Sequence, residues 1–141
     1  MEKFVADAAA LGINVVPDMD NPKLVIRIAS LNNWGASVIG LCESSRTLRR
    51  VTLDPDFWNA AQNDKQKELL MHHELGHCVL YRPHRSDRVL IPDGIEHTHE
   101  ASIMYPSIIG SAQYNLHYAW YQDELFNQVA IDDETRVHIC K

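Results

Sequence analysis

Residues 72–84, which read HHELGHCVLYRPH, decide the fold. Within this stretch His73, Glu74 and His77 form the pattern H-E-x-x-H. Four residues are slightly more than one helical turn, so the imidazoles of His73 and His77 project from one face of a helix and can share a zinc ion. Glu74 leans from the same helix toward the open side of the metal, where its carboxylate can accept a proton from water. His72 lies about 100° round the helix and is not expected to be a ligand.

Capping and helix-breaking residues frame a helix around this motif. Asn63 is a good N-cap, and Gln66 follows three residues later as in a capping box. The helix can run from there to Tyr81, and Pro83 ends it. A glycine inside a helix costs about 1 kcal/mol relative to alanine, so Gly76 indicates that another part of the chain packs closely there.

A third candidate ligand follows the helix. His84 comes seven residues after His77, just beyond Pro83. Three protein ligands and one open position are typical of a catalytic zinc site, whereas four protein ligands are typical of a structural one. We therefore expect His73, His77 and His84 to bind Zn²⁺.

Three short segments before the helix have the pattern of strands. Residues 23–29 (KLVIRIA) alternate apolar and polar side chains, which is typical of a strand with one buried face. Residues 37–43 and 49–54 are two further strands with a polar turn between them. Three strands so close together predict a small sheet.

Helices and loops account for most of the remaining chain. We expect a short amphipathic helix over residues 4–11, which stops at Gly12. Another helix opens at Asp54-Pro55. Residues 84–103 are predicted to be mostly loop, and a final helix runs from 111 to 130, with Ser111 as its cap. The tail after Ile131 is polar and is either extended or loose.

The length and composition of the chain limit the classes of function that it can have. The chain has 141 residues, 45% hydrophobic and 23% charged, which predicts one folded domain over residues 1–141. Its net charge is −6, with no dense stripe of Lys and Arg, so nucleic-acid binding is not expected. No run approaches the roughly 20 apolar residues of a membrane span. Residues 1–12 lack the pattern of a signal peptide, so the protein either stays in the cell that makes it or has lost a signal.

The chain has three cysteines, Cys42, Cys78 and Cys140, and no C-x-x-C metal motif. A disulfide between Cys42 and Cys78 is compatible with the sequence but not required by it. In a helix Cys78 would point about 100° away from His77, which favours a small buried hydrophobe over a fourth ligand.

Two separate motifs resemble those of the metzincin metallopeptidases. HELGHCVLYRPH (73–84) is similar to their zinc signature, H-E-x-x-H-x-x-G-x-x-H. SIMYP (102–106) resembles their Met-turn, a tight turn whose methionine, here Met104, lies beneath the metal. The order of ligand helix, loop, Met-turn and C-terminal helix is also that of metzincins. The chain looks closest to small bacterial and phage-borne metallopeptidases with an HELGHC segment.

The chain departs from the family pattern in two ways. Leu80 occupies the position of the turn glycine, and the third histidine, His84, comes one residue late because Pro83 stands in its usual place. Leucine can remain helical where glycine bends the chain, so we expect the helix to run half a turn longer. Asp87 is the alternative third ligand, because some metzincin relatives use aspartate there.

The resemblance implies an α+β, zincin-like fold: a small twisted sheet and active-site helix above, a Met-turn and C-terminal helix below. It implies a zinc-dependent endopeptidase in which Glu74 activates a zinc-bound water to hydrolyse a peptide or protein substrate. A strand near 38–43 would bind the extended substrate by β-addition. Two other functions stay open: a zinc protein that binds or regulates without cleaving, and a zinc hydrolase of a non-peptide amide such as cell-wall material. The oligomeric state is also open.

Some further residues carry weaker expectations. Tyr105 is a candidate for oxyanion stabilisation, although the corresponding metzincin tyrosine lies one position later, where this chain has Pro106. His97 and His99 are spaced as in a strand or loop. We expect them on the surface, with a place in the cleft or at a second ion as the alternative.

Overall fold

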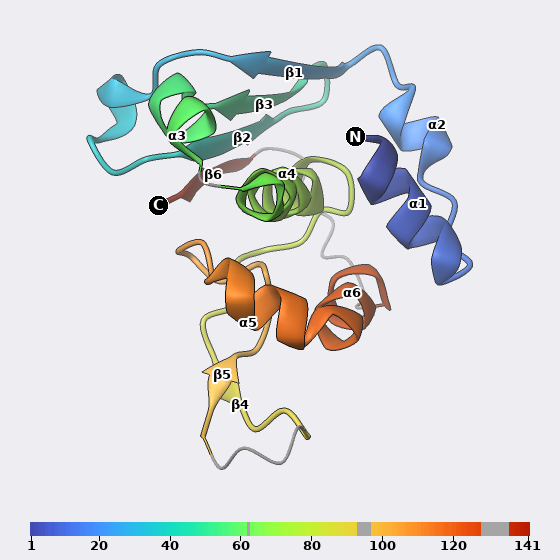
Figure 1. The fold of residues 1–141 in the computed structure, drawn as a ribbon. Helices are drawn as coiled ribbons and strands as arrows, with labels where there is room; N and C mark the ends of the chain where they lie inside the picture. Colours follow the sequence, from blue (N-terminus) through green and yellow to red (C-terminus); the bar gives the residue numbers. More distant parts are fainter. Residues whose placement is uncertain (62, 93–96, 128–135) are drawn as a thin grey trace.

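The structure, a computed structural model, describes residues 1–61, 63–92, 97–127 and 136–141 (Figure 1). A four-stranded sheet lies on one side of helix α4 (Asp64–Cys78), and two shorter helices lie on the opposite side. The strands of the sheet are β1 (Leu24–Ile28), β2 (Gly40–Ser44), β3 (Arg49–Leu53) and β6 (Arg136–Cys140). Their order is β1-β3-β2-β6, with β1 parallel to β3 and the other two pairs antiparallel. The architecture is therefore mixed α+β, as expected.

Three strands were predicted within a few residues of their observed bounds. The fourth lies in the tail after Ile131, for which the sequence was compatible with either an extended or a loose conformation. The polar tail contributes β6, whose residues pair with the outer edge of β2 over the full length of that strand. Val137 and Ile139 do alternate with Arg136, His138 and Cys140, as in a strand with one apolar face. Because the segment is short and follows a polar stretch, this alternation alone does not distinguish a strand from a loose tail.

The start of α4 confirms the prediction from capping. The Oδ1 of Asn63 accepts a hydrogen bond from the backbone N–H of Gln66 at 3.0 Å. The end of α4 differs from the prediction: the helix stops at Cys78, so the expectation that Leu80 extends it is wrong. Tyr81 adopts a positive φ of 56°, which residues other than glycine rarely do. The chain turns back there, and the N–H of Arg82 donates to the carbonyl of Gly76 at 2.9 Å.

The other helices of the described chain are short. They are α1 (Glu2–Ala10), α2 (Val16–Met19), the 3-10 helix η1 (Asn32–Trp34), α3 (Pro55–Ala60), α5 (Ser111–Leu116) and α6 (Tyr118–Asn127). The single helix expected over 111–130 is thus two helices, separated at His117. Its cap is Gly110 rather than Ser111, and residues 128–130 lie outside the described part of the chain.

The described residues of 84–103, which are 84–92 and 97–103, are mostly loop, as expected, with one antiparallel pair of short strands, β4 (Arg88–Val89) and β5 (His99–Glu100). This pair lies at the far end of the molecule from the four-stranded sheet (Figure 1). In the described part of the chain no helix is long and apolar enough to span a membrane.

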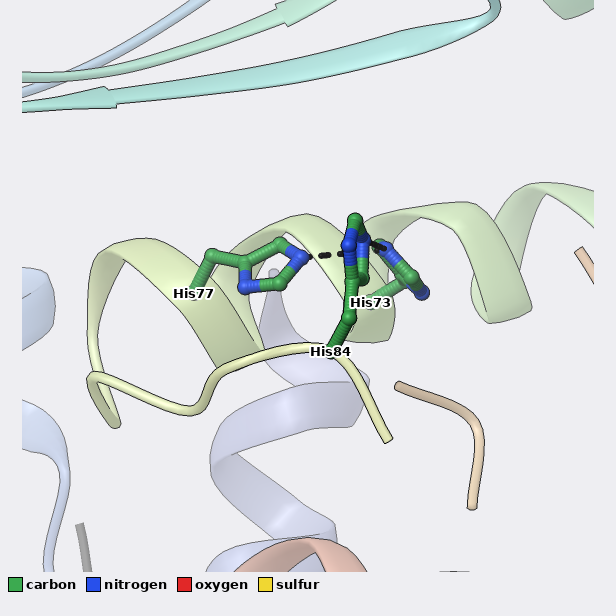
Figure 2. Close-up of side chains that lie close together, drawn as sticks. All are labelled: His73, His77 and His84. Atoms are coloured by element: carbon green, nitrogen blue, oxygen red, sulfur yellow. Dashed lines mark hydrogen bonds between the residues drawn. The ribbon is translucent and has the colours of Figure 1, made fainter. Parts of the chain in front are cut away.

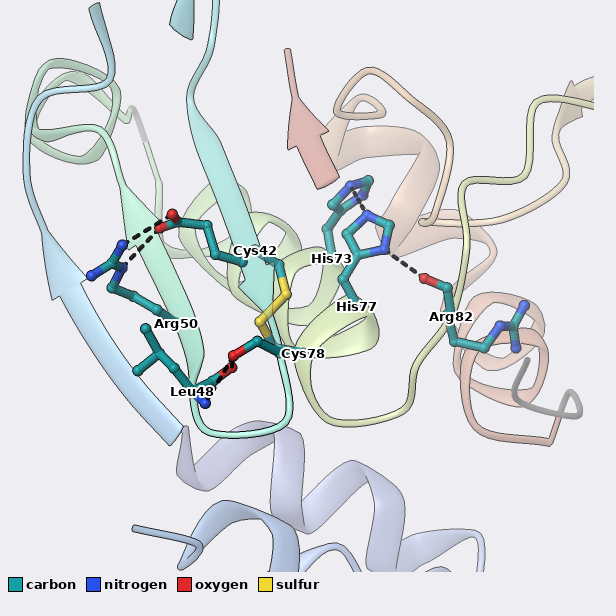
Figure 3. The surroundings of a disulfide bond; sticks show 9 residues. Cys42, Leu48, Arg50, His73, His77, Cys78 and Arg82 are labelled. Atoms are coloured by element: carbon teal, nitrogen blue, oxygen red, sulfur yellow. Dashed lines mark hydrogen bonds and ion pairs between the residues drawn. A yellow bond between two sulfur atoms is a disulfide. The ribbon is translucent and has the colours of Figure 1, made fainter. Parts of the chain in front are cut away.

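A disulfide joins Cys42 in the middle of β2 to Cys78, the last residue of α4 (Figure 3). The sequence left this pairing open. Cys78 is fully buried in the hydrophobic core, as expected. Cys140 is a free, buried thiol. Because Cys78 follows His77 directly, the bond holds the histidine-bearing end of α4 against the sheet.

Candidate metal centre

The three histidines expected as ligands lie together. His73 and His77 come from successive turns of α4 and are 1% and 2% exposed, and His84 reaches back from the loop after the helix (Figure 2). The Nε2 of His73 lies 3.1 Å from the Nε2 of His77 and 3.3 Å from that of His84. We call His73, His77 and His84 the metal cluster.

Backbone carbonyls fix the tautomers of the two helical ligands. The Nδ1–H of His73 donates to the carbonyl of Ile103 at 2.6 Å, and that of His77 donates to the carbonyl of Arg82 at 2.5 Å (Figure 3). A neutral imidazole that donates from Nδ1 presents a lone pair at Nε2. Burial lowers the pKa of His73 to about 3 and holds the pKa values of His77 and His84 below their usual range. The imidazoles are therefore neutral at neutral pH, and the two Nε2 lone pairs face each other.

A cation resolves this arrangement. Two facing lone pairs repel, whereas a tetrahedral zinc ion about 2.0–2.1 Å from each nitrogen would hold the nitrogens roughly 3.3–3.4 Å apart. The observed separations of 3.1 and 3.3 Å fit that geometry. Carbonyl partners on the second ring nitrogen are also typical of histidines that bind metals. His73, His77 and His84 could therefore hold a metal ion.

Glu74 is fully buried beside the metal cluster. It is 0% exposed, and neither of its carboxylate oxygens has a hydrogen-bond partner among the residues that the structure describes. Burial raises the pKa of Glu74 well above its usual range. Its side chain lies under Gly40 of β2, where an added Cβ would come within 2.2 Å of the Glu74 Oε1. Glycine at position 40 is what lets the carboxylate fit between the helix and the sheet.

The turn at residues 102–106 packs against the opposite side of α4. The N–H of Tyr105 donates to the carbonyl of Ser102 at 3.2 Å, which closes a 1,4-turn, and Met104 is fully buried. A Cβ at Gly76 would lie 2.5 Å from the Sδ of Met104. The expectation that something packs closely on Gly76 is confirmed, and its partner is the methionine of the predicted Met-turn.

A buried ionic network supports the same region, and it was not predicted from the sequence. Glu124 of α6, 4% exposed, pairs with Arg82 at 2.6 Å and with Arg85 at 3.1 Å. Its other carboxylate oxygen accepts a hydrogen bond from the hydroxyl of Ser102. The network ties the loop that carries His84 to the turn whose Ile103 carbonyl orients His73. The one signal in the sequence was an acidic residue within an apolar helical segment.

Asp87, the alternative third ligand, lies elsewhere. Its carboxylate is 51% exposed and pairs with Arg85 at 2.7 Å, away from the three converging nitrogens. Tyr105 is only partly buried and packs against the hydrophobic core. His72 points away from the metal cluster, and its Nε2 lies 2.9 Å from the Oδ2 of Asp7; with Asp7 and Glu68 it forms a separate group whose atoms could hold a metal ion.

The second group of histidines is partly buried rather than on the surface. His97 is exposed, but His99 is only 6% exposed and lies between the rings of His97 and His117. The expectation of a surface position is thus wrong for His99. Among the described residues, the sets whose ligand atoms could share a metal ion do not include these three histidines.

Two residues of β6 also reach the site, and the sequence did not indicate them. The ring of His138 stacks on that of His77, with centroids 4.0 Å apart and planes 4° from parallel. Cys140 offers its thiol within 4.8 Å of ligand atoms of His73 and Glu74. Burial, and then the nearby carboxylate of Glu74, raise the pKa of this thiol.

Comparison of the chain with protein-family models, with curated proteins and with solved structures found no match. The case for a function therefore rests on the geometry of the site.

Proposed function

We propose that this protein is a zinc-dependent hydrolase, and that its substrate is a peptide bond. One observation carries the proposal: the Nε2 atoms of His77 and His84 lie 3.1 and 3.3 Å from that of His73, two of the three rings are oriented by backbone carbonyls, and the buried carboxyl group of Glu74 lies on the same helix. Three ligands leave a fourth position open, which is typical of catalytic zinc.

The roles follow from the positions of the side chains. A bound Zn²⁺ supplies Lewis acidity: it polarises a carbonyl and lowers the pKa of a coordinated water to about 7. His73, His77 and His84 hold the ion, and the carbonyls of Ile103 and Arg82 keep two of these rings in the productive tautomer. Glu74 accepts a proton from the attacking water and delivers it to the nitrogen of the leaving amine.

The zincin-like fold belongs to the same proposal. The chain order of small sheet, ligand helix, methionine turn and C-terminal helices is the order of a metzincin-like domain, and the contact of Met104 with Gly76 supports this assignment. In such a domain a substrate strand would pair with the edge of β2, next to the metal cluster. The Cys42–Cys78 disulfide favours an oxidising compartment, where such bonds persist.

One observation favours a second function, that of a zinc protein that binds or regulates without cleaving. The two helical ligands and Glu74 are at most 2% exposed, so a substrate has no direct access to them. A hydrolase of a non-peptide amide would use the same residues as a peptidase, and substrate profiling separates the two.

The proposal is tested by zinc content and by cleavage of quenched fluorescent peptides. Glu74→Gln should keep one zinc per chain and lose cleavage about 10²–10⁴-fold, the usual contribution of a general acid–base group. His84→Ala should lose zinc, and Asp87→Ala, its matched control, should retain it. A chain that binds zinc but cleaves no peptide in any variant would contradict the peptidase proposal and favour the alternatives.

A further inference from the structure

The C-terminal residues 136–141 lie across the metal cluster. β6 pairs antiparallel with the outer edge of β2, with Cys140 opposite Gly40 and His138 opposite Cys42. Gly40 is the residue that covers Glu74, and Cys42 is bonded to the neighbour of His77 in α4. This register therefore sets β6 directly over the centre.

The same segment is also held from its other side. The N–H of Ile108 donates to the carbonyl of Lys141 at 2.9 Å, and the N–H of Lys141 donates to the carbonyl of Pro106 at 3.3 Å. Pro106 ends the turn that packs against α4. The C-terminal segment thus lies between the sheet edge and the turn, with backbone hydrogen bonds to both.

The two faces of β6 differ as the alternation of a strand requires. His138 and Cys140 point toward the metal cluster and Glu74. Ile139 packs on the other face against the small cluster around Leu41, and Val137 is 50% exposed. The side chains that approach the centre are therefore polar or polarisable, and those on the other face are apolar.

We propose that residues 136–141 are an intramolecular occupant of the peptide-binding edge of β2, and that a substrate peptide gains access only by displacing them. This inference rests on the proposed function and deepens it, because it assigns the site a regulation. The backbone groups along the outer edge of a strand can pair with one partner at a time, and the inner edge of β2 already pairs with β3. Because residues 136–141 belong to the same chain, they compete with a free peptide at a high effective concentration. In the free protein they therefore cover the outer edge of β2.

The test weakens the pairing of β6 in the full-length, zinc-loaded chain. In H138P/I139P two consecutive N–H groups are removed, and one of them must point toward β2 because successive groups alternate across a strand. Val137→Thr is the matched control, because it keeps a β-branched residue at an exposed position of the same strand. Circular dichroism, cooperative unfolding and zinc content establish that each variant is folded and loaded.

The probe is a fluorescent peptide, Arg-Val-His-Ile-Ser-Lys, which copies residues 136–141 with serine in place of Cys140. Its binding is measured by fluorescence anisotropy, alongside the cleavage of quenched peptides. We expect H138P/I139P to bind the probe at least tenfold more tightly than the parent chain and to cleave at least tenfold faster, with Val137→Thr unchanged. A folded, zinc-loaded H138P/I139P that binds the probe no better than the parent would overturn the inference.

The two proposals fail in different ways. Tighter binding without any cleavage would support the occupant and contradict the peptidase. Equal cleavage by the parent and by H138P/I139P would support the peptidase and overturn the occupant. If H138P/I139P does not fold, amide hydrogen exchange of the parent chain decides: the unlabelled peptide at millimolar concentration should speed exchange in 136–141 and leave β1 protected, and unchanged exchange in 136–141 would overturn the inference.

Discussion

Among the described residues, histidines gather in two places, and only one of these contains a set of histidine nitrogens that could hold a metal ion. The rings of the metal cluster have centroids 4.7–5.3 Å apart. We call the second group, His97, His99 and His117, the hairpin cluster. In it the ring centroid of His99 lies 4.4 Å from that of His97 and 4.5 Å from that of His117. The neighbouring rings of the hairpin cluster are therefore at least as close to each other as the rings of the metal cluster.

The difference lies in what orients each ring. In the metal cluster the carbonyls of Ile103 and Arg82 hold the Nδ1 of His73 and His77, which turns both Nε2 atoms inward. The ring angles are similar in the two clusters, tilted or edge to face, but the nitrogens of the hairpin cluster do not form one of the metal-binding sets found within the described residues. Closely spaced rings alone therefore do not make a metal site.

The largest effect should separate the two clusters outright. His73→Ala removes the nitrogen that lies within 3.3 Å of both other ligands, so we expect complete loss of stoichiometric zinc. His99→Ala, its counterpart in the hairpin cluster, should retain one zinc per chain. Elemental analysis after dialysis measures both, and zinc lost only from the His99 variant would reverse the assignment.

The second prediction concerns the buried ion pair between Glu124 and Arg82, which supports the loop and the turn around the metal cluster. Glu124→Gln leaves the buried Arg82 without its charge partner, which should lower the free energy of unfolding by about 3–5 kcal/mol. Zinc affinity should fall by roughly 10–100-fold, the usual effect of losing an outer-shell partner. Asp123→Asn, an exposed neighbour, is the control for both denaturant unfolding and zinc titration. Unchanged zinc affinity in Glu124→Gln would show that the network does not support the ligands.

How far the sequence could predict these features depends on how local their causes are. The helix start at Asn63, the three strands and the spacing of His73 and His77 depend on neighbouring residues, and the structure has them. The close packing on Gly76 was also predicted, since a glycine inside a helix has a local cost.

The features that the sequence did not predict depend on partners far along the chain. Tyr81 adopts its positive φ where the chain returns to the helix, and leucine at position 80 gave no hint of this. Glu124 acts through residues some 20 to 40 positions away. β6 is a strand because the edge of β2 accepts it. The alternation of Val137 and Ile139 with their polar neighbours is too short to show this alone.

The third prediction tests the anchoring of the metal cluster. Cys42→Ala/Cys78→Ala removes a bond that closes a separation of 36 residues, so the free energy of unfolding should fall by about 2–4 kcal/mol. Urea unfolding with and without reductant measures this in the parent chain, and the double variant should no longer respond to reductant. A parent chain equally stable in both conditions would contradict the anchoring role.

The smallest expected effect concerns the turn beneath α4. Gly76→Ala forces a methyl group against the Sδ of Met104, and overpacking of this kind typically costs about 1–3 kcal/mol. Gly110→Ala, where nothing lies within 4 Å of the added Cβ and φ is −66°, should cost less, because it only replaces glycine by the poorer helix cap alanine. Thermal unfolding of both variants checks the contrast, and equal melting temperatures would argue against the close packing of Met104.

The most direct test of the metal centre is X-ray absorption at the zinc edge of the full-length chain with one equivalent of zinc. We predict three imidazole nitrogens at about 2.0–2.1 Å and one further light ligand, with His84→Ala losing the metal. Zinc that does not bind, or a first shell with sulfur at about 2.3 Å and fewer than three nitrogens, would contradict it.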